Sequence, residues 1–278
     1  MKRVLTALIL IPLVLLLVFL GPRWQWLFML AVAAVASLAA WEFLGLAELG
    51  GAKPPRVAVL VAILALFVGN FIWPDQTAAI LGILSLALLV YCTFSRPVEQ
   101  MLPDVSTSLF CLLYLGFTLI ALPALREEAN GPSLVAFLLC IVWAGDIAAL
   151  YVGRAIGRHK MAPAISPNKS WEGAVGSVAG SLAAAGGLLA LAHFFAVQWD
   201  QVWLSYSDAE WWYWLGLAVL LNLAAQAGDL AESALKRSAG VKDSGSLLPG
   251  HGGVLDRIDA LLVAAPVLWY AQVIHHWF

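Results

Sequence analysis

Nine long, predominantly apolar runs limit what this chain can fold into. A helix of about 20 such residues crosses the roughly 30 Å hydrocarbon core of a membrane. Of the 278 residues, 62% are hydrophobic and 12% are charged, whereas about 25% are charged in soluble domains. The sequence therefore predicts an all-α polytopic integral membrane protein with about nine transmembrane helices. The runs cover residues 4–20, 26–46, 57–73, 77–94, 106–125, 133–153, 173–196, 212–235 and 255–274.

The basic residues predict how these helices are oriented. With nine spans, 13 of the 15 Lys and Arg residues fall on one side of the membrane, and only Arg23 and Arg126 fall on the other. Loops rich in Lys and Arg stay in the cytoplasm. We therefore expect a cytoplasmic N-terminus, an external C-terminus and cytoplasmic loops at 153–172 and 236–256. The run at 4–20 is interpreted as a membrane helix, because no small-residue cleavage site of a signal peptide follows it.

The two halves of the chain differ in the placement of charge. Residues 1–130 consist mostly of plain hydrophobic spans with short connections, whereas in residues 131–278 ionisable groups lie at span ends or within spans. Charged groups inside a membrane are costly and usually functional. We therefore predict an N-terminal transmembrane region and a C-terminal catalytic region.

Carboxylates gather around the two ends of the loop at 236–256. In AGDLAESALKR, Asp229, Ser233 and Lys236 share one helical face, because they are spaced at i, i+4 and i+7. Asp256 and Asp259 share a face at the start of the next helix. The intervening LLPGHGG cannot easily continue a helix. The segment is therefore expected to fold back and bring the carboxylates together.

Converging carboxylates with nearby cations suit a divalent metal that carries phosphate. Mg²⁺ takes one or two carboxylates and completes its shell with water and phosphate oxygens. Basic side chains and backbone N–H groups in a glycine-rich turn bind phosphate directly. The residues expected to contribute here are Lys236, Arg237, Lys242, Arg257, Gly252 and Gly253.

Two segments resemble a known enzyme family. SALKRSAGVKDSGSLLPGHGGVLDRID, residues 233–259, and HKMAPAISPNKSWEG, residues 159–173, are similar to the conserved blocks of the phosphatidate cytidylyltransferases, also called CDP-diacylglycerol synthases. The resemblance is strong over residues 140–260, and the N-terminal half agrees only in being helical membrane spans. One departure concerns Asp146, which is followed by Ile147 where the family has Thr or Ser. A structural and a catalytic role for Asp146 both stay open.

The resemblance implies an activity in phospholipid biosynthesis. CTP and phosphatidate would give CDP-diacylglycerol and pyrophosphate with Mg²⁺, and a second, monovalent cation is left open. It further implies a homodimer in membrane lipid, here in a bacterial inner membrane, with a cytoplasm-facing site and no nucleic-acid partner. The implied catalytic residues are Asp229, Ser233, Lys236, Asp256 and Asp259, and the metal ligands among them are Asp229, Asp256 and Asp259. The expected substrate-phosphate-binding residues are Lys160, Lys169, Arg237, Lys242, His251, Gly252, Gly253 and Arg257.

Two other functions remain compatible with these patterns. Carboxylates inside a membrane also build ion-coupled transporters, although these often contain inverted repeats, and we find no internal repeat. Another CTP-dependent lipid enzyme, such as a polyprenol kinase, would use similar cations and carboxylates. His251 has two interpretations as well, because it could orient a phosphate or stabilise the turn.

Overall fold

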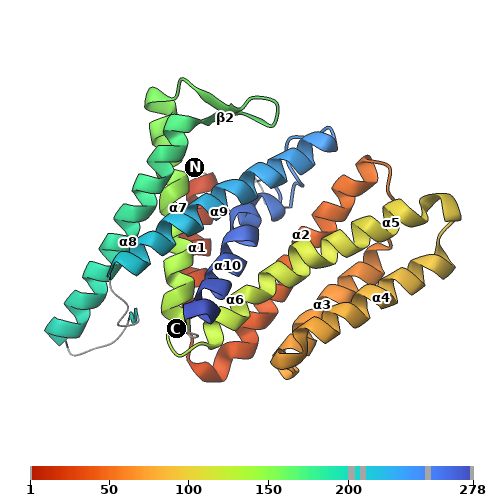
Figure 1. Ribbon diagram of the computed structural model, residues 1–278, viewed down its shortest axis with the longest axis horizontal. Helices are drawn as coiled ribbons and strands as arrows, with labels where there is room; N and C mark the ends of the chain where they lie inside the picture. The colour runs from red at the N-terminus through yellow and green to blue at the C-terminus, as the bar shows by residue number, and fades with distance from the viewer. Residues whose placement is uncertain (1, 200–203, 207–210, 248–251, 276–278) are drawn as a thin grey trace. The chain divides into compact units, whose positions relative to one another are not determined.

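The computed structural model describes residues 2–199, 204–206, 211–247 and 252–275, and most of them are helical (Figure 1). Two short 3₁₀ turns, η1 (Pro22–Trp24) and η2 (Pro74–Gln76), precede the second and fourth α-helices, and a π-helical turn, η3 (Leu112–Phe117), joins the fifth to the sixth. The α-helices of the described chain are α1 (Lys2–Phe19), α2 (Gln25–Leu49), α3 (Arg56–Ile72), α4 (Thr77–Ser95), α5 (Val98–Cys111), α6 (Thr118–Glu127), α7 (Gly131–Ile156), α8 (Trp171–Trp199), α9 (Trp211–Ser238) and α10 (Leu255–His275).

Seven helical segments of the described chain are long and apolar enough to cross a membrane. Two further apolar helices, α1 with 18 residues and α3 with 17 residues, are not among these seven segments. Eight of the nine predicted apolar runs each lie on a single α-helix to within one residue, and the run 106–125 extends over α5, η3 and α6. The all-α class of a polytopic membrane protein is therefore confirmed, while the number of nine spans stays a prediction. The seven segments are Pro22–Leu49, Pro74–Ser95, Val98–Glu127, Gly131–Ile156, Trp171–Gln198, Trp211–Ser238 and Leu255–His275.

The chain forms two compact units, and each of them joins two separate stretches of sequence. The first unit contains Met1–Pro123 and Leu235–Ile258, and the second contains Ala124–Ala234 and Asp259–Phe278. The polar segment near the C-terminus therefore packs with the N-terminal helices. The predicted functional division at residue 130 is a separate matter and stays a prediction.

In the first unit, α2 packs against α3 and α5, and α3 and α4 form an antiparallel hairpin (Figure 1). Phe43 of α2 contacts Phe110 with ring centroids 5.6 Å apart, and Phe110 stacks on Tyr114 at 5.2 Å. Aromatic pairs at such distances add to the stabilisation from burial. This aromatic cluster fixes the part of α2 that contains Phe43 and the adjacent residue Glu42.

In the second unit, the C-terminal part of α7 packs closely against the N-terminal part of α8. Gly180 of α8 lies so close to α7 that a Cβ there would be 2.4 Å from the Cβ of Ala148. Asn222 of α9 donates hydrogen bonds from Nδ2 to Ser177 and Ser181 of α8, each 2.8 Å long. Small residues and interhelical hydrogen bonds are the usual means of helix association in membranes. They fix α9 against α8 within this unit.

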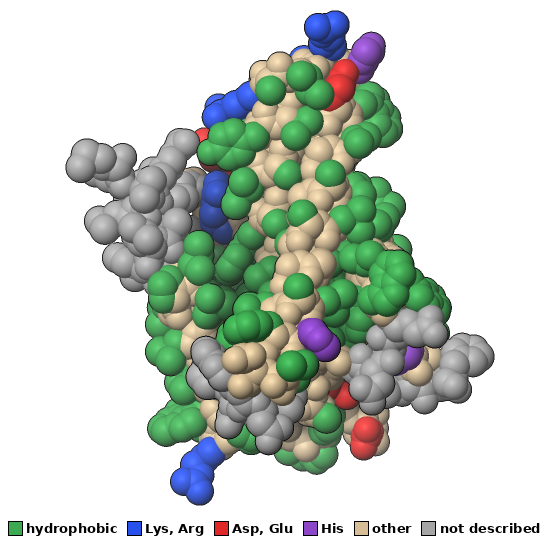
Figure 2. All heavy atoms as spheres, turned by 90° about the vertical axis from the view of Figure 1, so that its left-hand side faces the viewer, with side chains coloured by type: hydrophobic (Ala, Val, Ile, Leu, Met, Phe, Trp, Pro, Cys, Tyr) green, Lys and Arg blue, Asp and Glu red, His purple; other side chains and the backbone are tan. Residues whose placement is uncertain are grey.

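A short β-hairpin follows α7, within the predicted loop 153–172. Its strands, β1 (Lys160–Ala162) and β2 (Ser166–Ser170), pair in antiparallel register. Glu172 ties the hairpin to the start of α8, because its carboxylate lies 2.6 Å from Nδ1 of His159. On the face drawn in Figure 2, apolar side chains cover much of the helical surface, and charged side chains gather mainly toward its ends. This distribution is typical of a surface that faces lipid.

Candidate active site

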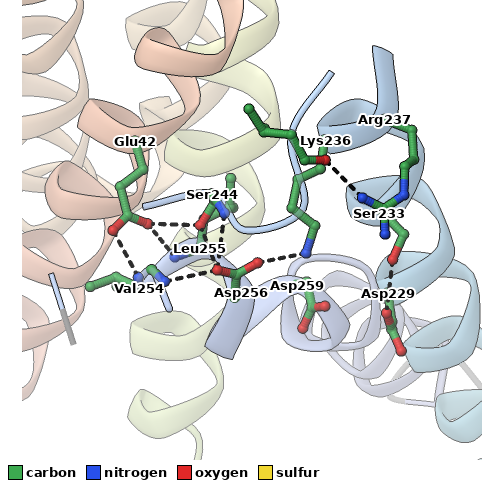
Figure 3. Close-up of polar contacts among 12 residues, drawn as sticks. Glu42, Asp229, Ser233, Lys236, Arg237, Ser244, Val254, Leu255, Asp256 and Asp259 are labelled. Atoms are coloured by element: carbon green, nitrogen blue, oxygen red, sulfur yellow. Dashed lines mark hydrogen bonds and ion pairs between the residues drawn. The ribbon is translucent and has the colours of Figure 1, made fainter. Parts of the chain in front are cut away.

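In the first unit, Lys236 and Asp256 form a nearly buried ion pair. Lys236 lies in the last turns of α9, Asp256 lies in the first turn of α10, and Nζ is 2.5 Å from Oδ1. The two side chains are only 12% and 6% exposed. The second carboxylate oxygen of Asp256 accepts hydrogen bonds from the backbone N–H groups of Gly253 at 2.8 Å and Ser244 at 3.1 Å (Figure 3). Asp256 therefore organises the loop that precedes it.

The two glycines before α10 are required by the shape of this loop. Gly252 has a φ of 79°, which L-residues with side chains rarely adopt. A Cβ on Gly253 would lie 2.1 Å from Oγ of Ser244. The sequence suggested that both glycines bind phosphate. In this structure the N–H of Gly253 donates to Asp256, and phosphate binding by the two glycines stays a prediction.

A further carboxylate in the first unit was not identified from the sequence. Glu42 of α2 is 5% exposed and accepts hydrogen bonds from the N–H groups of Val254, at 3.0 Å, and Leu255, at 2.9 Å. Its Oε2 atom is also 3.1 Å from Oγ of Ser244. The available signal was a single charged residue within the apolar run 26–46, since such residues are functional candidates by default.

In the second unit, Asp229 of α9 is paired with Lys169 of β2. The distance from Nζ of Lys169 to Oδ2 of Asp229 is 2.6 Å, and both side chains are partly exposed. Ser233, one turn further along α9, lies 3.5 Å from Oδ1 of Asp229. The predicted helical face is thus present, and the hairpin supplies its counter-ion. The sequence predicted Lys169 as a phosphate ligand and did not anticipate this pair.

Helix α9 approaches α10 closely in this unit. A Cβ on Gly228 would be 2.5 Å from the backbone oxygen of Asp259. Asp229 and Glu232 of α9 and Asp146 of α7 lie in the neighbourhood of Asp259. Glu232 is fully buried. The second unit therefore contains an acidic group that includes Asp229 and Asp259, two of the predicted metal ligands.

The remaining predicted phosphate-binding cations are exposed. Arg237 donates a hydrogen bond from Nη1 to the backbone oxygen of Val241 at 2.8 Å. His251 lies outside the described residues. The exposed cations are Lys160, Arg237, Lys242 and Arg257.

The carboxylates have the chemistry that Mg²⁺ requires. Asp229 and Asp256 each form an ion pair with a lysine, and the ammonium group occupies a position beside the carboxylate oxygen that a metal ion could take. Within the described ranges, no group of three or more His, Cys, Asp and Glu side chains could hold a metal ion by itself. Mg²⁺ needs only one or two carboxylates when waters and substrate phosphates complete its shell. The residues present are therefore compatible with Mg²⁺.

The model of the cytidylyltransferase family matches residues 1–275. The chain belongs to the cytidylyltransferase family. Because this match includes the N-terminal half, the expectation that this half agrees only in being helical spans was too narrow.

Several bacterial relatives of the cytidylyltransferase family are named phosphatidate cytidylyltransferase. The protein of Brucella suis biovar 1 is 46% identical over 159 residues, which is 57% of this chain and 54% of that protein. In that alignment the chain spans about half the length of the relative. The Pseudomonas aeruginosa protein is 36% identical over 97% of both chains, and the Synechocystis protein is 31% identical over 98% of this chain and 96% of its own length.

Proposed function

We propose that this protein transfers CMP from CTP to phosphatidate and releases pyrophosphate, giving CDP-diacylglycerol. The observation that carries the proposal is similarity along almost the whole chain to a protein named phosphatidate cytidylyltransferase. The sequence segment most specific to that family, residues 233–259, contains the Lys236–Asp256 pair and the loop that Asp256 holds. Substrates and activity in this chain are inferred from these two facts together.

The reaction needs charge neutralisation more than it needs a base. A phosphatidate oxygen is already anionic near neutral pH, because the second pKa of a phosphate monoester is about 6. This oxygen attacks the α-phosphorus of CTP and forms a new P–O bond. The bond from the α-phosphorus to the bridging oxygen breaks, and pyrophosphate leaves with the electron pair.

The chain's own residues would supply the binding and the charge for this step. Asp229, Asp256 and Asp259 are the proposed ligands of Mg²⁺, which when bound would supply stabilisation of negative charge on phosphate oxygens. Lys236 would donate to phosphate oxygens once substrate competes with Asp256 for its ammonium group. Ser233 would orient Asp229. The exposed cations and the amide of Gly252 would contribute further contacts to phosphate, with His251 as an additional candidate.

The setting of this chemistry is proposed from the distribution of charge. The many cations on one side favour a site that faces the cytoplasm, with the N-terminus on the same side. Bacterial relatives favour an inner membrane. The family resemblance favours a homodimer. Phosphatidate would keep its acyl chains in lipid while CTP arrives from water.

The product identifies the reaction. We expect purified protein in detergent to form CDP-diacylglycerol from CTP and phosphatidate, with pyrophosphate released in equal amount, and to stop when EDTA is added. The lipid product is identified by its mass. A phosphorylated lipid alcohol, formed when a polyprenol is supplied, would favour the kinase alternative. Folded protein that gives no product with any nucleoside triphosphate would favour a transporter.

Lys160 and Lys169 are expected to act in substrate binding. Replacing both by Gln should raise the KM for CTP or phosphatidate at least about tenfold, because a charged hydrogen bond contributes about 1.5–3 kcal/mol and 1.4 kcal/mol corresponds to tenfold. Steady-state kinetics with each substrate varied in turn measures this change. Lys53→Gln removes one positive charge, half the change made by the double variant, from an exposed residue between α2 and α3 and serves as the control. Unchanged KM values in the double variant would assign both lysines to membrane orientation alone.

A further inference from the structure

Glu42 is a charged residue buried within a helix that the sequence marks only as a hydrophobic span. Its carboxylate is 5% exposed and receives three contacts, from the N–H groups of Val254 and Leu255 and from the hydroxyl of Ser244 (Figure 3). All four residues belong to the first unit. The cost of burying a carboxylate is offset by several hydrogen-bond donors of this kind.

The contacts of Glu42 fix the start of α10. The first N–H groups of an α-helix have no acceptor within the helix, and a negative charge near them is favourable. A side chain within a few residues usually provides this acceptor. Here the acceptor is 212 residues from Val254 and 213 residues from Leu255 in sequence. The start of α10 is therefore held against α2.

The same contacts reach Asp256. Asp256 directly follows Leu255, and the Ser244 hydroxyl lies 3.1 Å from Oε2 of Glu42 and 3.0 Å from Oδ2 of Asp256. A hydroxyl carries one proton, so it donates to one carboxylate at a time. Through the backbone and through Ser244, a change at Glu42 would be transmitted to the carboxylate of Asp256.

Two glycines leave space for the Glu42 carboxylate. A Cβ at Gly245 would lie 2.5 Å from Oε1 of Glu42, and a Cβ at Gly253 would lie 2.3 Å from Oε2. Since real Cβ contacts are longer, neither position accepts a side chain while Glu42 stays in place. The loop between α9 and α10 is thus shaped around a residue of α2.

We propose that Glu42 is a positioning residue that sets the orientation of Asp256 by anchoring the start of α10 and the loop before it. The proposal rests on the proposed cytidylyltransferase function for its activity readout. Glu42 acts through Asp256 and Ser244 and does not touch substrate. This role connects the N-terminal helices to the chemistry of the C-terminal segment.

The first test replaces Glu42 by Gln, which keeps the shape but places an NH₂ group against a backbone donor. We expect kcat to fall about 10- to 100-fold, as for residues that orient a functional ligand, and the KM for phosphatidate to change much less. Asp104→Asn is the matched control. Asp104 is also fully buried in the first unit and accepts the N–H of Lys53 at 2.6 Å, at a different loop. It should keep the wild-type kcat per folded molecule.

A second readout does not depend on activity. Hydrogen exchange of the peptide that contains Val254 and Leu255 should be faster in Glu42→Gln than in the wild type or in Asp104→Asn. Exchange in the middle of α10 should be the same in all three. Unchanged exchange at Val254 and Leu255 would contradict the anchoring contact itself.

A double-mutant cycle keeps the proposal testable if Glu42→Gln folds poorly. Gly245→Ala should lower kcat in the wild type, because its Cβ displaces the Glu42 carboxylate, but should have little added effect in Glu42→Ala, which lacks the carboxylate and the Cγ and Cδ atoms that this Cβ would meet. If the losses in kcat caused by the two single substitutions simply multiply in the double variant, the proposal is overturned. A kcat of Glu42→Gln equal to that of the wild type would overturn it as well. Absence of CDP-diacylglycerol from the wild type itself would instead refute the proposed function.

Discussion

Asp256→Asn is expected to reduce kcat at least about 100-fold while the protein stays folded in the membrane. The substitution removes the charge that pairs with Lys236, whose side chain is only 12% exposed. Without this charge Lys236 is no longer held in its place, and a loss of about 2.7 kcal/mol of transition-state stabilisation corresponds to about 100-fold in rate. Loss of a proposed Mg²⁺ ligand acts in the same direction.

The measurement is CDP-diacylglycerol formation by purified Asp256→Asn at several Mg²⁺ concentrations. Size-exclusion chromatography in detergent establishes that the variant is folded. Asp75→Asn, which changes an exposed carboxylate at the turn before α4, is the control and should have wild-type activity. An Asp256→Asn enzyme with full activity would remove both the ion pair and the metal ligand from the proposed site.

Gly253→Ala is expected to have an effect of similar size for a steric reason. The added Cβ would lie 2.1 Å from Oγ of Ser244 and 2.3 Å from Oε2 of Glu42. Overpacking of this kind typically costs about 1–3 kcal/mol and shifts the backbone. A displacement of about 1 Å at a catalytic group can cost about 100-fold in rate. We therefore expect kcat to fall about 100-fold.

The control for Gly253→Ala is Gly186→Ala in α8. A Cβ at Gly186 meets no atom within 4 Å, and Ala is favoured over Gly inside a helix by about 1 kcal/mol. Activity assays and thermal unfolding of the two variants should therefore separate the effect at the loop from the general effect of replacing glycine. Equal activity in the two variants would show that the close packing at Gly253 has no catalytic consequence.

The sequence predicted the parts of this structure that depend on local pattern. Apolar runs of membrane-spanning length became helices because their backbone groups must bond within the segment in lipid. The spacing of Asp229 and Ser233 placed both on one face of α9, as observed. The glycines and proline of LLPGHGG indicated that α9 and α10 are separate helices, and the bounds Ser238 and Leu255 agree.

Long-range contacts could not be predicted in the same way. Glu42 is more than 200 residues from the amides it accepts, so no window of sequence contains both partners. The Lys169–Asp229 pair depends on a hairpin whose strands have three and five residues. Alternation of apolar and polar residues needs at least four to eight residues to indicate a strand. These contacts became visible only in three dimensions.

The central claim is that the α-phosphorus of CTP is transferred to phosphatidate. The most direct measurement incubates the wild-type protein with phosphatidate and Mg²⁺, using CTP labelled either at the α- or at the γ-phosphorus, and counts label in the extracted lipid. The account predicts that the α label enters the lipid and that the γ label is found in pyrophosphate. A lipid labelled from the γ-phosphorus would show kinase chemistry and would contradict the account.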